Sequence, residues 1–149
     1  MSFNFSKSEF ESELAKSSST VLFKKIASDT ITPVLSALKI FQKFDNHHFL
    51  FESAENGNNK GRFSVLGFMP DLAWKCTGNE SFINNDFHHD KDNFHQESGN
   101  ALDNLRNLNK RSHINWDNLH YDSNKLPSIC SGIFGYMGYD IIKLVEKIT

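Results

Sequence analysis

Two apolar runs separated by a glycine-containing turn constrain the fold of this chain more than any other feature. Residues 49–54 and 62–69 are rich in aromatic and branched side chains, and Asn-Gly-Asn-Asn-Lys-Gly lies between them. Such runs, joined by turn-forming residues, predict a β-hairpin whose loop is longer than two residues. Because neighbouring residues of a strand point to opposite faces, Glu52 and Ser53 would lie on different faces of the first strand.

The carboxylate of Glu52 needs a partner if the hairpin is buried, because desolvating an unpaired carboxylate costs several kcal/mol. A small zwitterion such as an amino acid could supply N–H donors and a positive charge. Alternatively, Glu52 pairs with Arg62 across the hairpin or reaches water at its mouth. The residues alone favour this local solution, because polar groups in sheets are commonly satisfied by their neighbours.

Helical signals precede the hairpin. Ser6-Lys7-Ser8-Glu9 fits a capping box and predicts a short amino-terminal helix. Residues 20–26 are expected to form a strand. Thr32-Pro33 supplies an N-cap hydroxyl and a first-turn proline to a predicted helix over residues 33–43. The apolar stripe of this helix, expected to pack on a sheet, consists of Val34, Leu35, Leu38 and Phe41.

The second half of the chain alternates strand and helix signals. Residues 72–77 and 81–84 extend the strand pattern, residues 85–100 predict an exposed polar loop, and residues 101–110 predict a helix. The tail is expected to form an apolar strand interrupted by Gly132, Gly135 and Gly138, followed by a helix entered at Tyr139-Asp140. These elements predict an α/β fold of the α+β type, an antiparallel sheet with packed helices, in one domain over residues 1–149.

Composition excludes several classes of partner. The chain of 149 residues has a net charge of −2 and a pI near 6.4, which indicates no general attraction for nucleic acid or anionic membranes. No apolar run reaches the roughly 18 residues that span a bilayer, and the start lacks a signal-peptide pattern. Cys76 and Cys130 form no C-x-x-C pair and suit a reducing compartment. We therefore expect a cytoplasmic protein without nucleic-acid or membrane partners.

Two clusters invite a ligand and also have a simpler explanation. The glycines of SGIFGYMGYD recur every third residue, which is not the G-x-G-x-x-G of a dinucleotide site, and glycine in a strand more often marks a bulge or a close approach. His88-His89-Asp90, with Asp86 and His95, could chelate zinc, but a polar loop without a scaffold is usually solvated. We assign no metal ligand and, because no triad or paired carboxylates stand out, no catalytic residue.

Three motifs in order resemble the amino-terminal region of anthranilate synthase component I, in the superfamily of chorismate-utilising enzymes. They are SDTITPVLSALKI, FLFESAENG…GRFSVLGFMPDLAWK and SGIFGYMGYDIIKLVE, and the resemblance covers roughly residues 20–148. The family's hairpin is close to L-L-E-S followed by R-Y-S-x-x-G. It stands here as Phe51-Glu52-Ser53 and Arg62-Phe63-Ser64-Val65-Leu66-Gly67.

The resemblance implies a tryptophan-binding regulatory site. In that family the L-E-S strand lines the site at which L-tryptophan, the end product of the pathway, inhibits the enzyme. Carried over, Glu52 and Ser53 would contact the inhibitor, and Ser64 on the paired strand would lie nearby. A carboxylate and hydroxyls suit the charged groups of an amino acid, and phenylalanine-rich walls suit an indole.

The resemblance also implies what this chain lacks. The family converts chorismate and ammonia or glutamine into anthranilate and pyruvate, with Mg²⁺ and with ammonia from a glutamine amidotransferase subunit (component II). Its chorismate site and Mg²⁺-binding glutamates belong to a longer carboxyl-terminal portion. We therefore expect residues 1–149 to be an incomplete region, inactive alone and without cofactor ligands.

Three alternatives stay open at this point. Aminodeoxychorismate synthase component I shares the architecture, although its hairpin tends to lack the Glu-Ser and Arg-Phe-Ser combination. A stand-alone amino-acid-binding module would share the pocket and have no enzymatic role. A structural remnant would bind nothing.

Overall fold

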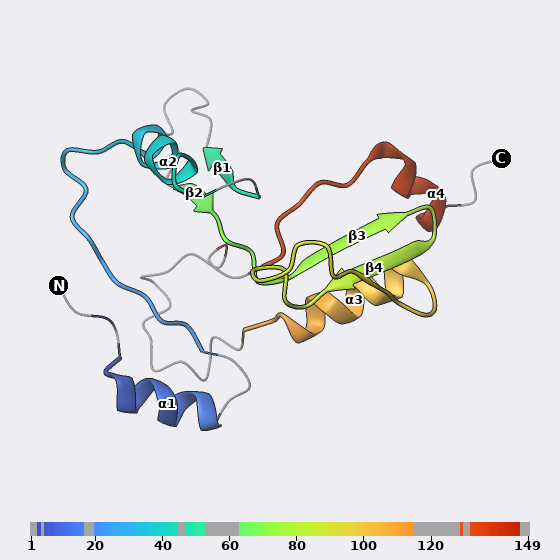
Figure 1. Cartoon of the computed structure of the whole chain (residues 1–149), viewed down its shortest axis with the longest axis horizontal. Helices are drawn as coiled ribbons and strands as arrows, with labels where there is room; N and C mark the ends of the chain where they lie inside the picture. The colour runs from blue at the N-terminus through green and yellow to red at the C-terminus, as the bar shows by residue number, and fades with distance from the viewer. Residues whose placement is uncertain are drawn as a thin grey trace. The chain divides into compact units, whose positions relative to one another are not determined.

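A computed structural model describes residues 3, 5–16, 20–44, 47–52, 63–114, 129 and 132–146 of the chain. The chain forms two compact units. Unit 1 comprises Met1–Asp29 and Asn109–Phe134, and unit 2 comprises Thr30–Leu108 and Gly135–Thr149. Helices and antiparallel sheets are both present (Figure 1), so the α+β class predicted from the sequence is confirmed.

Unit 1 begins with α1 (Lys7–Lys16), where the predicted capping box is confirmed. The Ser6 backbone N–H donates to Oε2 of Glu9 at 2.8 Å, and the Glu9 N–H donates back to Oγ of Ser6 at 3.4 Å. The strand predicted over residues 20–26 is wrong. Among the described residues this segment has an isolated bridge between Phe3 and Lys24 and forms no strand.

In unit 2, α2 (Pro33–Phe41) starts at the predicted N-cap, since the Leu35 N–H donates to Oγ1 of Thr32 at 3.2 Å. α2 contacts β2, and Phe41 of the predicted stripe is half-buried. Ala37 is only 2% exposed, whereas three residues of the stripe are largely exposed, namely Val34, Leu35 and Leu38. The prediction that Val34, Leu35 and Leu38 are buried was therefore wrong, and Ala37 is the buried residue of α2.

The predicted hairpin is confirmed as β1 (Phe49–Glu52) paired antiparallel with β2 (Ser64–Gly67). A second sheet follows, with the order β3-β4-β5 and antiparallel pairing throughout. Its strands are β3 (Ala73–Thr77), β4 (Glu80–Asn84) and β5 (His95–Gln96). The first two match the predicted strand segments.

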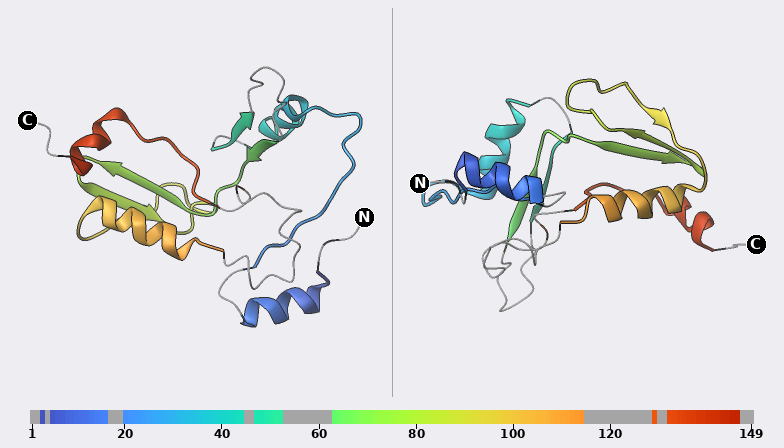
Figure 2. Two further views of the ribbon diagram at one scale, coloured as in Figure 1. Left: turned by 180° about the vertical axis from the view of Figure 1, so that it is seen from behind. Right: turned by 90° about the horizontal axis from the view of Figure 1, so that it is seen from below.

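α3 (Ala101–Arg111) confirms the helix predicted over 101–110 and runs along β3 and β4 (Figure 2). The backbone N–H of Ala101 donates to Oδ1 of Asn79 at 3.2 Å, which ties the start of the helix to the β3–β4 turn. The core of this part of unit 2 consists of Ser81, Ile83, Asn84, Phe87, Ala101 and Leu108, all buried. The segment 85–100 is thus not wholly an exposed loop, because Phe87 is buried and β5 pairs with β4.

The tail differs from its prediction in one element. Residues 132–138 form no strand, so the glycine-interrupted strand is not found in that segment. A 3₁₀ turn, η3 (Tyr139–Ile141), begins at the predicted helix entry and continues into α4 (Ile142–Val145). Across the described residues, every helix is too short or too polar to cross a lipid bilayer.

Candidate functional site

The hairpin brings two of the three predicted site residues together. Glu52 lies directly opposite Ser64 in the β1–β2 ladder, and Leu50 lies opposite Leu66 one pair further along the same face. Cross-strand partners have Cβ atoms roughly 4.5–5.5 Å apart, so the carboxylate and the hydroxyl project side by side. They form the last described pair of the ladder, at the end where the loop begins.

Both side chains of this pair are exposed. Among the described residues the Glu52 carboxylate has no ion-pair or hydrogen-bond partner. Ser53 and Arg62 lie outside the described residues, and the alternative pairing of Glu52 with Arg62 falls there too. An exposed carboxylate beside a hydroxyl can accept N–H donors from a ligand and, through the hydroxyl, also donate to one.

Exposed aromatic side chains lie next to the Glu52–Ser64 pair in sequence, on the other face of the ladder. Phe51 and Phe63, which flank the Glu52–Ser64 pair in sequence, are 48% and 47% exposed. The rings of Phe49 and Phe51 lie 4.8 Å apart between centroids, with an interplanar angle of 36°. Large aromatic rings this exposed offer apolar surface to a ligand or to a further part of the protein.

The histidine-rich segment forms a local contact. His89 Nδ1 lies 2.6 Å from Oδ1 of Asp86, and the rings of His88 and His89 are 4.9 Å apart. No group of three or more His, Cys, Asp or Glu side chains gathers in metal-binding geometry within the described residues. Cys76 is a free, half-buried thiol whose Sγ donates to the carbonyl of Gly78 at 3.1 Å, and Cys130 lies outside that part of the chain.

Two features of unit 2 were not predicted from the sequence. One is a polar network in which a half-buried carboxylate, Glu97, accepts hydrogen bonds from Trp74 and Ser81. The other is a cavity of about 200 Å³ beside His47 and Lys91. In the sequence, the only signal for the cavity is a basic residue next to a phenylalanine at 43–44 and at 87–88. The walls of the cavity come from segments far apart in the chain.

The known proteins that this chain resembles in sequence are named as anthranilate synthase component 1 or alpha subunit. No protein-family model and no solved structure matches the chain. It is 37% identical over 128 residues to anthranilate synthase component 1 of Cereibacter sphaeroides, covering 86% of this chain and 24% of that protein. It is 29% identical over 145 residues to the chloroplastic anthranilate synthase alpha subunit 2 of Arabidopsis thaliana, covering 93% and 22%.

A third relative is anthranilate synthase component 1 of Aquifex aeolicus, 27% identical over 133 residues, with 85% of this chain and 24% of that protein covered. The chain spans about a quarter of the length of the curated relatives it matches. The likeness to the anthranilate synthase component 1 family that the three motifs predicted is thereby confirmed, over a segment about a quarter as long as those proteins.

Proposed function

We propose that this chain forms the amino-terminal region of an anthranilate synthase component 1 and that its hairpin binds tryptophan as a feedback inhibitor. The observation that carries the proposal is the register of β1 and β2. It sets the carboxylate of Glu52 beside the hydroxyl of Ser64 at the open end of the ladder, with no other partner for the carboxylate among the described residues.

The chemistry of this pair suits a free amino acid. The Glu52 carboxylate would accept from the α-ammonium group, and the hydroxyls of Ser53 and Ser64 would donate to the α-carboxylate. On the face of Glu52 and Ser64, the neighbouring cross-strand pair Leu50 and Leu66 would lie against the indole, while the exposed rings of Phe51 and Phe63 lie on the other face. Ser53 directly follows the last described residue of β1, so all three polar groups belong to the loop end of the hairpin.

The catalytic reaction belongs, in this proposal, to the whole enzyme. Chorismate would be converted to anthranilate by a larger protein with Mg²⁺ and a glutamine amidotransferase subunit, and this segment alone would be inactive. The cytoplasm is the compartment we propose, although two of the relatives are named as chloroplastic. The names of the relatives favour this branch over aminodeoxychorismate synthase component I, and over a module without an enzyme.

Inhibition would follow from a population shift. The whole enzyme would exist in two states, one that binds chorismate well and one that binds it poorly. Tryptophan bound at the hairpin would favour the second state, and the size of this shift is set by the difference in tryptophan affinity between the two states. A residue that contacts only the inhibitor should therefore change inhibition without changing turnover.

The test is inhibition of the assembled enzyme that carries this chain. Glu52→Ala and Ser53→Ala should leave turnover without tryptophan unchanged. They should raise the tryptophan concentration for half-inhibition about tenfold or more, because a hydrogen bond to a charged group contributes roughly 1.5–3 kcal/mol. Glu80→Ala is the matched control, since Glu80 is an exposed glutamate at a strand end in the other sheet. Unchanged inhibition in both variants would refute the assignment.

A further inference from the structure

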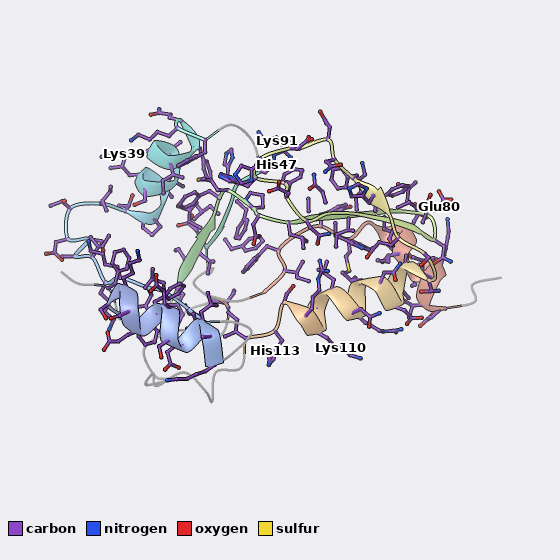
Figure 3. All side chains as sticks on the ribbon, turned by 60° about the horizontal axis from the view of Figure 1, so that its bottom comes forward. Lys39, His47, Glu80, Lys91, Lys110 and His113 are labelled. Carbon is purple, nitrogen blue, oxygen red and sulfur yellow. The ribbon has the colours of Figure 1, made fainter. Side chains whose placement is uncertain are left out.

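We infer that unit 2 carries a second ligand site, for a small aromatic carboxylate, in the cavity of about 200 Å³ beside His47 and Lys91. None of the residues of the proposed tryptophan site lines this cavity, so the inference does not depend on that proposal. His47 and Lys91, which are labelled in Figure 3, both line the cavity.

The polar lining of the cavity consists of basic residue types. Two lysines, Lys43 and Lys91, and two histidines, His47 and His88, contribute to it, and none of its described lining residues is acidic. The two lysines supply positive charge in a chain whose net charge is −2. Basic groups gathered around one hollow raise the local concentration of anions.

The ammonium groups of Lys43 and Lys91 are not neutralised by the described residues. Neither makes an ion pair or a hydrogen bond with them. Asp90 and Asp92 flank Lys91 in sequence, but among the described residues neither carboxylate forms an ion pair with it. Oδ1 of Asp90 accepts the backbone N–H of Asp92 at 3.0 Å, and Oδ1 of Asp86 contacts His89 at 2.6 Å. An anion in the cavity would therefore gain charge-assisted hydrogen bonds that the protein itself does not make.

The apolar lining is aromatic and held in place. Phe87 is 5% exposed, and its backbone N–H donates to the carbonyl of Asp71 at 2.9 Å, which fixes it against the Met69-Pro70 wall. Its ring meets the His47 ring edge-on, with centroids 4.7 Å apart. On another wall, Phe44 stacks on Phe68 at 5.1 Å. Fixed aromatic rings beside a few polar groups are typical of small-molecule sites.

The backbone around the cavity is unusual. His47 has φ 62° and Met69 has φ 53°, and within the described chain these are the non-glycine residues with positive φ. Both line this cavity. Left-handed backbone is unfavourable for such side chains, and residues held in it cluster at ligand-binding sites.

Size and charge together define the ligand. A volume of about 200 Å³ is below the roughly 300–1,000 Å³ of sites for drug-sized molecules, so a single ring with one anionic group is the class that fits. Three probes separate the contributions of ring and charge. Benzoate has both, inorganic phosphate has the charge without the ring, and benzamide has the ring without the charge.

The test is an NMR titration of the ¹⁵N-labelled 149-residue chain with benzoate, benzamide and inorganic phosphate. Benzoate should give saturable shifts at the amides of the described lining residues 43, 44, 47, 69, 87, 88 and 91, and should bind at least tenfold more tightly than either of the other probes. The double variant Lys43→Gln/Lys91→Gln should weaken benzoate binding about tenfold or more, because two charge-assisted contacts are lost.

The double variant Lys39→Gln/Lys110→Gln is the control, since it removes the same charge from α2 and α3 and neither residue lines the cavity (Figure 3). It should bind benzoate like the unmodified chain. Equal binding of benzoate and benzamide, equal binding of benzoate and phosphate, equal weakening by both double variants, or no saturable shift at these amides would each overturn the inference.

Discussion

Trp74 and Glu97 are joined by a hydrogen bond of 2.8 Å from the indole N–H to Oε2 of the carboxylate. Ser81, which is 1% exposed, donates to the same oxygen at 3.0 Å and accepts from Nδ2 of Asn104 at 2.9 Å. One polar network therefore connects β3, β4 and α3. Asn104 also donates to the carbonyl of Ser98 at 3.1 Å, so the segment leading into α3 is held by the same group.

Removing the carboxylate should destabilise unit 2. In Glu97→Ala the indole N–H and the buried Ser81 hydroxyl lose their acceptor, and an unsatisfied buried donor costs about 1–3 kcal/mol. Glu97→Gln keeps one acceptor oxygen and should lose less. Urea unfolding followed by tryptophan fluorescence measures both changes.

Glu80→Ala is the matched control for this network. Glu80 is exposed and accepts only a long hydrogen bond, 3.4 Å, from Gln96, so its removal should change stability by less than about 0.5 kcal/mol. A Glu97→Ala chain as stable as the Glu80→Ala chain would contradict the structural role of the network.

The sequence could not predict this network, although it predicted the strands that carry it. Residues 85–100 are so polar that an exposed loop was the natural expectation, and the two phenylalanines that anchor the segment are isolated. Phe87 is buried and Phe94 packs edge-on to it at 5.9 Å. Lys75 lies 3.9 Å from the centroid of the Phe94 ring and adds a cation–π contact. These contacts are long-range, so no local pattern reveals them.

The N-cap of α2 should contribute measurably to stability. Thr32→Ala removes the oxygen that accepts from the Leu35 N–H, and such a change costs about 0.5–2 kcal/mol. Thr32→Ser keeps the oxygen and is the control. Hydrogen exchange of the first-turn amides of α2 should accelerate in the alanine variant alone, and equal exchange in both variants would be inconsistent with capping by Thr32.

The capping box of α1 should make that helix sensitive to pH. The hydrogen bonds from the Ser6 hydroxyl and backbone N–H lower the pKa of Glu9 below its ordinary value. A carboxyl whose pKa is depressed by folding stabilises the helix above its unfolded pKa, about 4.3 for glutamate, and this contribution is lost as pH falls through the lower folded value.

NMR chemical shifts of α1 recorded from neutral to acidic pH check this expectation. The helical shifts should weaken below about pH 4.3. Ser6→Ala should remove most of this dependence by removing the hydroxyl. Glu11→Gln, which breaks only an exposed contact of 3.8 Å to Lys7, should leave the dependence intact. A pH response unchanged by Ser6→Ala would exclude the capping box as its origin.

The local features of the fold were predicted correctly from the sequence, but which segments pack against one another was not. Both caps depend on residues three positions apart, the hairpin joins two strands that follow each other in sequence, and all three are confirmed. The strand expected over 20–26 is not formed, and among the described residues the segment has an isolated bridge between Phe3 and Lys24 instead. The face of α2 was wrong because hydrophobic spacing does not say which part of an apolar helix meets the sheet.

The two proposed ligand sites differ in how far the sequence anticipates them. The resemblance to the family already placed Ser64 near Glu52 on the paired strand, and the register of β1 and β2 sets the two residues opposite each other. The cavity could not be predicted, because its described lining residues come from three separate segments, namely Lys43, Phe44 and His47, then Met69 and Pro70, then Phe87, His88 and Lys91. Its chemistry depends on tertiary packing.

The most specific test of the hairpin concerns Gly67, the last residue of its R-F-S-x-x-G motif. Gly67 lies opposite Phe49 in the ladder, and the Phe49 ring fills the space that a Cβ at position 67 would need. Gly67→Ala should therefore displace the ring and destabilise the hairpin by about 1–3 kcal/mol, as overpacking does. Gly135→Ala is the control, because nothing lies within 4 Å of its added Cβ.

If the Phe49 ring is the cause, Phe49→Ala should abolish the additional loss of stability of Gly67→Ala in a double-mutant cycle. Exchange of the amides of residues 64–67 measures each variant, and an additive double mutant would exclude the ring as the reason for glycine at this position.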